Sequence, residues 1–352
     1  MRTWLITGGA GFIGSNFVRM AAARGAARLV VLDALTYAGN YANIADMIDG
    51  DTAEFVHGSI NDADLLAGLF DRHDIVRVVH FAAESHVDRS IIGPRAFIET
   101  NVMGTAALLE AARAAWQGDG DRLFLHVSTD EVYGDLGPGD PPFTEASSYR
   151  PSSPYSASKA GSDHLVRSWH RTYRFPAVVT SCSNNYGPWQ FPEKLIPLMI
   201  LNAAEGRELP VYGDGRQIRD WLHVEDHCEA LLAVLERGRA GETYAIGGGN
   251  EQANIDIVHR ICQAVDDHLG RAAGTAAALI RHVTDRPGHD RRYAIDAAKA
   301  HRELDWRPRK AFDTALSELV AWYLEHTDWV SQIRSGEYLH YYDTQYGERL
   351  GQ

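Results

Sequence analysis

The stretch MRTWLITGGAGFIG, residues 1–14, joins a short apolar run to a cluster of glycines, and a second apolar stretch, Phe17–Ala23, follows it. Thr3–Thr7 has the length and side chains of a strand, whereas Phe17–Ala23 has apolar residues at helical spacing. Glycines between a strand and a helix permit a tight turn and let backbone amides approach a pyrophosphate at the helix N-terminus. The stretch therefore predicts a dinucleotide-binding turn, with a purely structural turn as the alternative, built on Gly8, Gly9, Gly11 and Gly14.

The rest of the first half repeats this alternation of β-branched runs and helical patterns. Such alternation predicts an α/β fold of the Rossmann type, a doubly wound and mostly parallel sheet with helices on both faces. The expected strands are Thr3–Thr7, Leu29–Asp33, Glu54–His57, Val76–Phe81, Leu123–Ser128 and Ala177–Ser181. The expected helices are Phe17–Ala23, Asp62–Phe70, Ile98–Trp116, Tyr155–Thr172 and Asp226–Glu236.

The alternation of strand and helix patterns becomes less regular after about residue 185, where prolines and glycines interrupt shorter elements. We therefore expect a cofactor-binding domain over residues 1–184, and a smaller, mainly substrate-binding domain over residues 185–325 whose chain crosses back to the first. Residues 326–352 form a tail. Ligands of a parallel sheet bind at the carboxyl ends of its strands, so functional residues should follow the strands.

Asp33 is the first such residue. It ends the second expected strand, 19 residues after Gly14, where a carboxylate can bind the adenine ribose hydroxyls of a dinucleotide. A carboxylate at this place repels a 2′-phosphate, so the sequence favours NAD over NADP. The alternative for Asp33 is a solvated strand end.

Tyr155 and Lys159 are candidates for the chemistry. They lie four residues apart at the start of an expected helix, so their side chains share one face. A phenol is a poor base at neutral pH because its pKa is near 10. A nearby ammonium group and the positive nicotinamide ring would favour the phenolate and make Tyr155 a usable base.

Composition and charge exclude several classes of function. The chain has 352 residues, of which 45% are hydrophobic and 23% charged, as in folded globular proteins. Its formal net charge of −13 disfavours a surface that binds nucleic acid. The 3 cysteines are widely spaced and the 16 histidines show no metal-ligand spacing, so we expect neither a disulfide framework nor a metal site. We see no apolar run of membrane-spanning length and no leader before the first strand, and we expect a cytoplasmic protein without membrane partners.

Longer stretches give the chain a family resemblance. The glycine turn with Tyr155 and Lys159 resembles the extended short-chain dehydrogenase/reductases, and within them the chain resembles the dTDP-glucose 4,6-dehydratases to about residue 325. The stretches that carry this resemblance are LDALTYAGN (32–40), FAAESHVDRS (81–90), FIETNVMGT (97–105), HVSTDEVYG (126–134), SNNYGP (183–188), FPEKLIP (191–197), QIRDWLHVEDH (217–227) and DRPGHDRRYAID (285–296). It implies an NAD-dependent hydro-lyase that converts dTDP-glucose to dTDP-4-keto-6-deoxyglucose and water.

Two adjacent carboxylates, Asp130 and Glu131, follow Thr129 at the end of an expected strand. Like charges repel there, so the pair would be unusual as structure alone, although a surface turn is the alternative. Dehydration needs such a pair, because a base must remove the proton on carbon 5 and an acid must protonate the departing hydroxyl on carbon 6. By resemblance Glu131 is the base and Asp130 the acid, which requires an environment that raises the pKa of Asp130.

The resemblance also implies contacts along the whole chain. For the cofactor they are Gly8, Gly11, Phe12, Ile13, Gly14, Asp33, Thr36, Ser59, Ile60, Ala82, Ala83, Ser85, Thr100, Tyr155, Lys159 and Asn185. For the sugar nucleotide they are Ser85, Thr129, Asn184, Lys194, Leu195, Pro210, Tyr212, Arg219, Asn254, Arg286 and His289, and arginine suits a diphosphate because its planar group binds two oxygens together.

Some features depart from the family or leave alternatives open. Ser59 stands where the family usually has an acidic residue, which predicts weaker cofactor binding with unchanged chemistry. The tyrosine-rich tail from Trp329 onward matches less well, and we expect it to pack against the body or a partner. Family members pair through two long helices, so we expect a homodimer through Ile98–Trp116 and Tyr155–Thr172. The alternatives are a dehydratase or epimerase acting on GDP- or UDP-sugars and, from another class, a non-catalytic NAD-binding sensor.

Overall fold

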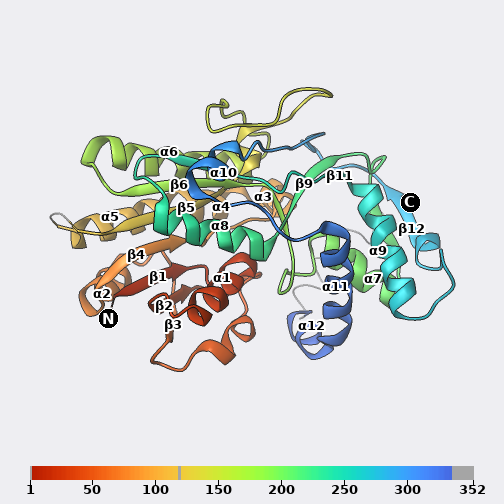
Figure 1. Cartoon of the computed structure of the whole chain (residues 1–352), viewed down its shortest axis with the longest axis horizontal. Helices are drawn as coiled ribbons and strands as arrows, with labels where there is room; N and C mark the ends of the chain where they lie inside the picture. The colour runs from red at the N-terminus through yellow and green to blue at the C-terminus, as the bar shows by residue number, and fades with distance from the viewer. Residues whose placement is uncertain (1, 118–119, 335–352) are drawn as a thin grey trace.

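The computed structural model describes residues 2–117 and 120–334, which form two lobes (Figure 1). The larger lobe holds a parallel sheet of seven strands in the order β10-β6-β5-β4-β1-β2-β3. The strands are β1 (Thr3–Thr7), β2 (Arg28–Asp33), β3 (Ala53–His57), β4 (Ile75–His80), β5 (Leu123–Thr129), β6 (Ala177–Cys182) and β10 (Thr243–Ile246). The strand order reverses between β1 and β4, which is the point where such sheets bind ligands. The predicted Rossmann-type fold is confirmed.

Helices cover both faces of this sheet because successive strand residues point to opposite sides. Ile6 and Val31 belong to the core beneath α1 (Phe12–Ala23), α8 (Val224–Arg237) and α10 (Ala298–Leu304). Their neighbours Leu5 and Val30 belong to the core beneath α2 (Ala63–Arg72), α5 (Thr105–Ala115) and α6 (Pro154–Tyr173). The strands are therefore apolar on both faces, as a buried parallel sheet requires.

The smaller lobe has its own core, and it lies at one end of the large sheet (Figure 1). It contains a three-stranded sheet, a two-stranded sheet and four helices. The strands are β7 (Asn184–Tyr186), β8 (Leu209–Tyr212), β9 (Ile218–His223), β11 (Glu251–Ala253) and β12 (Ile280–Val283), and the helices are α7 (Leu195–Glu205), α9 (Asn254–His268), α11 (Phe312–Glu325) and α12 (Thr327–Ile333).

The chain passes between the lobes more than once. Helix α8 and strand β10 lie within residues 185–325 but pack in the larger lobe, where β10 pairs with β6. Helix α12 falls within the predicted tail and packs in the core of the smaller lobe. The tyrosine-rich end of that tail, residues 335–352, lies outside the described residues.

The predicted helix Ile98–Trp116 is wrong in its first third. After the short helices α3 (Val87–Ile92) and α4 (Pro94–Phe97), residues Ile98–Gly104 form a π-helical segment, η3, and the α-helix begins only at Thr105. Here the Asn101 side chain donates to Glu84 O at 2.9 Å and accepts from Glu84 N at 2.8 Å. These bonds fix the loop after β4. An apolar pattern cannot distinguish a π-helical turn from an α-helical one.

Within residues 2–117 and 120–334, no helix is both long and apolar enough to cross a membrane. The same residues contain no group of three or more His, Cys, Asp or Glu side chains that could hold a metal ion.

The need for glycine in the turn between β1 and α1 can be tested by substitution. A Cβ atom on Gly14 would lie 2.2 Å from Gly8 O and 2.8 Å from Gly9 Cα, so the turn between β1 and α1 cannot keep its shape with alanine there. We expect Gly14→Ala to weaken NAD binding by about tenfold or more, an effect of over 1 kcal/mol, measured by calorimetric titration. Gly68→Ala in α2 is the matched control, because no atom lies within 4 Å of its added Cβ.

We expect Gly68→Ala to leave NAD affinity unchanged and to raise the free energy of unfolding by roughly 0.5–1 kcal/mol, since alanine is the better helix former. Equal NAD affinity in the two variants would contradict the steric argument.

Candidate active site

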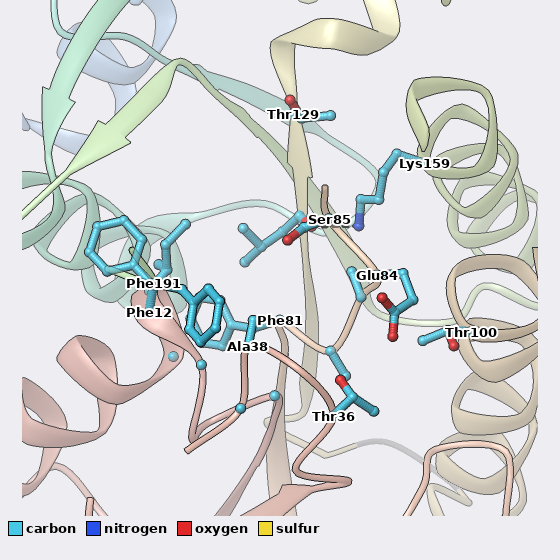
Figure 2. A pocket seen from close by; sticks show the side chains of 18 of the residues that line it. Phe12, Thr36, Ala38, Phe81, Glu84, Ser85, Thr100, Thr129, Lys159 and Phe191 are labelled. Carbon is cyan, nitrogen blue, oxygen red and sulfur yellow. Dashed lines mark hydrogen bonds between the residues drawn. The ribbon is translucent and has the colours of Figure 1, made fainter. Parts of the chain in front are cut away.

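A pocket at the carboxyl edge of the large sheet collects the predicted residues. Every residue predicted to bind the cofactor lines it, and so do Thr129, Asp130 and Glu131. Figure 2 shows Phe12 and Phe191 close together on one side of this pocket, and the Lys159 amine directed into it from another. The sheet brings these residues together because its strands all end at this edge.

The turn between β1 and α1 is shaped to receive a dinucleotide. Gly8 has a φ of +72°, and a Cβ there would lie 2.5 Å from Ala82 N in the loop after β4. Gly11 caps α1 without a side-chain hydrogen bond, which leaves the amides of the first helical turn directed at the pocket. Asp33 at the end of β2 accepts from Ala10 N at 2.9 Å and Leu35 N at 2.8 Å. These residues fit the pyrophosphate and ribose of NAD.

Asp130 lies where β5 ends and the short 3-10 helix η4 (Asp130–Tyr133) begins. It is buried, and its Oδ2 has no hydrogen-bond partner among the described residues. Burial raises the pKa of Asp130 well above its usual value, and the nearby charges of Glu131 and Asp220 raise it further. The direction agrees with the expectation for a carboxyl group that must hold a proton.

Glu131 shares Arg219 with Asp130 but otherwise has different charged neighbours. Burial raises the pKa of Glu131, while the charges of Arg286, Arg219 and Lys194 act to lower it. All three cations come from the smaller lobe or the segment leading into it. The adjacent carboxyl groups are therefore held unequally: cations dominate the charges around Glu131, whereas carboxylates dominate those around Asp130.

Tyr155 and Lys159 lie in the first two turns of α6, as predicted. Lys159 Nζ donates to Val127 O at 2.9 Å. Burial raises the pKa of Tyr155 well above 10, the charges of Glu131 and Asp130 raise it further, and Thr129 partly offsets them by a hydrogen bond. The expectation that the ammonium group favours the phenolate omitted burial and these carboxylates. The protein alone therefore holds Tyr155 protonated, and the positive nicotinamide ring must supply the opposing field.

Asp163, which sequence reasoning missed, lies one turn beyond Lys159 on the same helix. It is fully buried and accepts from Ser128 Oγ at 2.8 Å and Tyr149 OH at 2.7 Å, with His126 Nε2 at 3.1 Å. Burial acts to raise the pKa of Asp163, but the hydrogen bond of His126, the charge of Lys159 and the Tyr149 hydroxyl outweigh burial and hold that pKa below its usual value. Its charge in turn opposes the lowering of the Lys159 pKa by burial. The four-residue spacing Tyr155, Lys159, Asp163 was the available signal.

The predicted sugar-nucleotide residues divide into two groups. Ser85, Thr129, Asn184 and Lys194 line the pocket, whereas seven others lie in the smaller lobe outside its lining: Leu195, Pro210, Tyr212, Arg219, Asn254, Arg286 and His289.

Contacts within the second group tie it to the pocket. Arg286 Nη1 and Tyr212 OH both donate to the carboxylate of Asp88, at 2.9 and 3.1 Å. The Tyr212 and His289 rings lie 6.1 Å apart. Arg219 and Arg286 also act electrostatically on Glu131. The second group therefore forms a cationic extension of the pocket, suited to a diphosphate and a nucleoside.

Other residues lining the pocket were not predicted. Tyr37, Glu84, Phe191 and Glu193 all lie within the stretches that carry the family resemblance. Burial raises the pKa of Glu193 to about 7, against the opposing charges of Lys194 and Arg89. The Arg89 guanidinium also lies over the Tyr37 ring, 4.1 Å from its centre. The signal for Glu193 was a carboxylate directly beside Lys194.

Known proteins similar to the chain share this organisation over nearly its whole length. A family model described as GDP-mannose 4,6 dehydratase matches residues 5–319. A dTDP-glucose 4,6-dehydratase of Xanthomonas campestris pv. campestris is 56% identical, over 96% of this chain and 97% of its own, and one of Shigella flexneri is 53% identical, over 98% and 99%. A dTDP-glucose 4,6-dehydratase structure from Streptomyces venezuelae with NAD and TYD bound is 49% identical, with a TM-score of 0.84 over 93% of this chain and 98% of that one.

The buried carboxyl groups of Asp130 and Asp163 should have opposite effects on the free energy of unfolding as the pH changes. The pKa of Asp130 is raised on folding, so its contribution to stability is present in acid and is lost as the pH rises through the folded-state pKa. The pKa of Asp163 is lowered on folding, so its contribution is present at neutral pH and is lost as the pH falls through the folded-state value.

We therefore expect Asp130→Asn to raise the free energy of unfolding at pH 8 by about 1–3 kcal/mol, because folding at this pH requires Asp130 to take up a proton, whereas asparagine is neutral at every pH. Asp163→Asn should lower it by about 3 kcal/mol at pH 7, because it breaks a buried charged network. Urea unfolding at several pH values between 5 and 8 measures both. A loss of stability in Asp130→Asn that grows with pH would contradict the assigned protonation.

Proposed function

The chain belongs to the family whose model is described as GDP-mannose 4,6 dehydratase, and we propose that within this family it converts dTDP-glucose to dTDP-4-keto-6-deoxyglucose and water with NAD as its cofactor. One observation carries the proposal more than the others. Adjacent carboxyl groups of unequal surroundings, Asp130 and Glu131, lie in a pocket beside Tyr155 and a dinucleotide turn. Bound NAD supplies the redox chemistry, since it takes a hydride from carbon 4 and returns it to carbon 6, with no net NADH.

The first proton transfer belongs to Tyr155. Its phenol lies at the pocket wall, and its partner Thr129 is placed to hold the sugar hydroxyl beside it. Tyr155 takes the proton of the hydroxyl on carbon 4 as that carbon is oxidised. Lys159 lies one turn further along α6, and the carboxylate of Asp163 favours its charged form, so a positive charge stays near the phenolate that accepts this proton.

Elimination belongs to the two carboxyl groups. A ketone at carbon 4 makes the proton on carbon 5 acidic, and Glu131 removes it because three cations favour its ionised form. Asp130 donates its proton to the oxygen on carbon 6, which leaves as water. Glu131 then returns its proton to carbon 5. An epimerase has no water to expel and does not need a protonated carboxyl group beside a carboxylate.

The other assignments extend the same proposal. Residues 1–184, with α8 and β10, form the cofactor domain, and the smaller lobe binds the nucleotide through Arg219, Arg286 and their neighbours. The preference for a thymine nucleotide rests on the relatives. The three buried thiols, Cys182, Cys228 and Cys262, are free, and they suit a reducing cytoplasm, where we place the enzyme.

Glu131→Gln tests the elimination step. The amide cannot accept the carbon 5 proton, so we expect dehydration of dTDP-glucose to slow by about 10²–10⁴-fold while NAD reduction in a single turnover continues. Mass spectrometry measures the loss of one water, and absorbance at 340 nm follows NADH. Glu318→Gln on the exposed side of α11 is the matched control and should behave as the wild type. Dehydration at the wild-type rate in Glu131→Gln would exclude Glu131 as the base.

We also propose that the chain forms a homodimer through one helical face. Five large apolar side chains are 40–71% exposed on or beside helices of the larger lobe: Ile91 and Ile92 in α3, Ile98 and Met103 in η3, and Tyr173 at the end of α6. Segments η3 and α6 pack against each other, as do α3 and α6. A second copy of the chain presents the same apolar face and can cover it.

Met103→Asp tests this face. Met103 is 60% exposed, and a buried charge in a symmetric interface would be repeated on both copies, so we expect the variant to be monomeric. Leu269→Asp, at a position 41% exposed at the end of α9 in the smaller lobe, is the control and should leave the assembly unchanged. Sedimentation velocity distinguishes the two masses. A Met103→Asp variant with the wild-type mass would place the interface elsewhere.

A further inference from the structure

The C-terminal helix α12 lies against the N-terminal half of the chain. Its Trp329 is buried, with 7% of its surface exposed, and lies ten residues beyond the last residue matched by the family model. Its indole Nε1–H donates to Asn43 Oδ1 at 2.7 Å, across 286 residues of sequence. Asn43, in the 3-10 helix η1 (Tyr41–Asn43), is itself 2% exposed. This contact is a directional hydrogen bond within an otherwise aromatic cluster.

Asn43, which accepts this hydrogen bond, also contacts the glycine turn. Its Nδ2 donates to Ala10 O at 2.8 Å, and Asn40 N donates to the same oxygen at 3.1 Å. Ala10 stands between Gly9 and Gly11, and its N–H donates to Asp33 Oδ2 at 2.9 Å. Ala10 is thus held at its N–H by the carboxylate expected to bind ribose, and at its carbonyl oxygen by Asn43. Trp329 in turn fixes the side-chain amide of Asn43, which makes this contact.

The same C-terminal region also contacts a second segment that lines the pocket. Tyr323 OH, in α11, donates to Gln190 O at 2.6 Å, and Gln190 lines the pocket. Trp189 has a φ of +67°, a left-handed conformation unusual for a bulky residue. Its ring lies 5.0 Å from that of Trp322 and 5.5 Å from that of Trp329, so it belongs to the same aromatic cluster.

We propose that Trp329 is a positioning residue of the cofactor site, which acts through Asn43 on the backbone of the glycine turn. The C-terminal helix is then part of the machinery that retains NAD, although none of its residues lines the pocket. The inference rests on NAD binding at the glycine turn and on no later step of the proposed reaction. Without the hydrogen bond from Trp329, the side-chain amide of Asn43 can rotate. The Ala10 carbonyl oxygen then loses one of the two hydrogen bonds that fix it.

Trp329→Phe is the test, because phenylalanine keeps an aromatic ring in the cluster and removes the donor. Trp322→Phe is the matched control: it makes the same change in the same cluster, away from the bond to Asn43. The measurement is the rate at which bound NAD exchanges with labelled NAD in the purified holoprotein. We expect exchange to be about three- to tenfold faster in Trp329→Phe, as for the loss of one hydrogen bond, and changed by less than about twofold in Trp322→Phe.

Asn43→Ala separates positioning from general packing. It should speed NAD exchange by itself, and adding Trp329→Phe to it should cause little further change, since the two residues act in series. The KM for dTDP-glucose should stay within about twofold in every variant, because none of the substituted side chains is among the predicted sugar-nucleotide contacts. Equal exchange in Trp329→Phe and Trp322→Phe, or full additivity with Asn43→Ala, would overturn the proposal. NAD exchange needs no dehydratase activity, so failure of the proposed reaction would be seen separately.

Discussion

Burial of charge at the carboxyl edge of the sheet is the constraint on which the site depends. An ionised group that leaves water must find a partner or give up its charge. Along α6 the ammonium group of Lys159 and the carboxylate of Asp163 are both buried and compensate each other. Asp130 has carboxylates among its nearest charges and keeps a proton instead. The chemistry of the site therefore depends on which of its buried groups are charged and which are neutral.

The two-lobed fold explains how neighbouring carboxyl groups acquire different states. Asp130 and Glu131 are adjacent in sequence and follow β5, yet different charges surround them. Those charges come largely from the smaller lobe: Arg286 acts on Glu131, Asp220 acts on Asp130, and Arg219 acts on both. Arg219 and Arg286 also suit a diphosphate, so in the proposed reaction the substrate's phosphates would lie close to the charges that favour the ionised form of Glu131. Nucleotide recognition and base strength would then be linked through these arginines.

The sequence predicted those features that follow from local pattern. The strands of the large sheet, the helix that carries Tyr155 and Lys159, and the glycine turn were predicted to within one or two residues at most ends, because alternation and glycine spacing are visible in short windows. The π-helical segment η3 was missed because apolar spacing does not register one extra residue per turn. Asp163 and Trp329 were missed for another reason. Their partners lie far away in sequence, and only folding shows that a carboxylate meets Ser128 or that an indole meets Asn43.

The path of the chain has a consequence for the cofactor site. Strand β10 and helix α8 complete the larger lobe only after the chain has begun the smaller one, and α12 returns to the glycine turn from the far end. The turn between β1 and α1 is therefore shaped by its own glycines but fixed by residues at both ends of the sequence. A turn held only by local contacts would respond to substitutions nearby, whereas this one should also respond to a change at Trp329 in α12. Helix α12, which lies beyond the residues matched by the family model, is a part of the fold through which cofactor retention can vary while the catalytic residues stay unchanged.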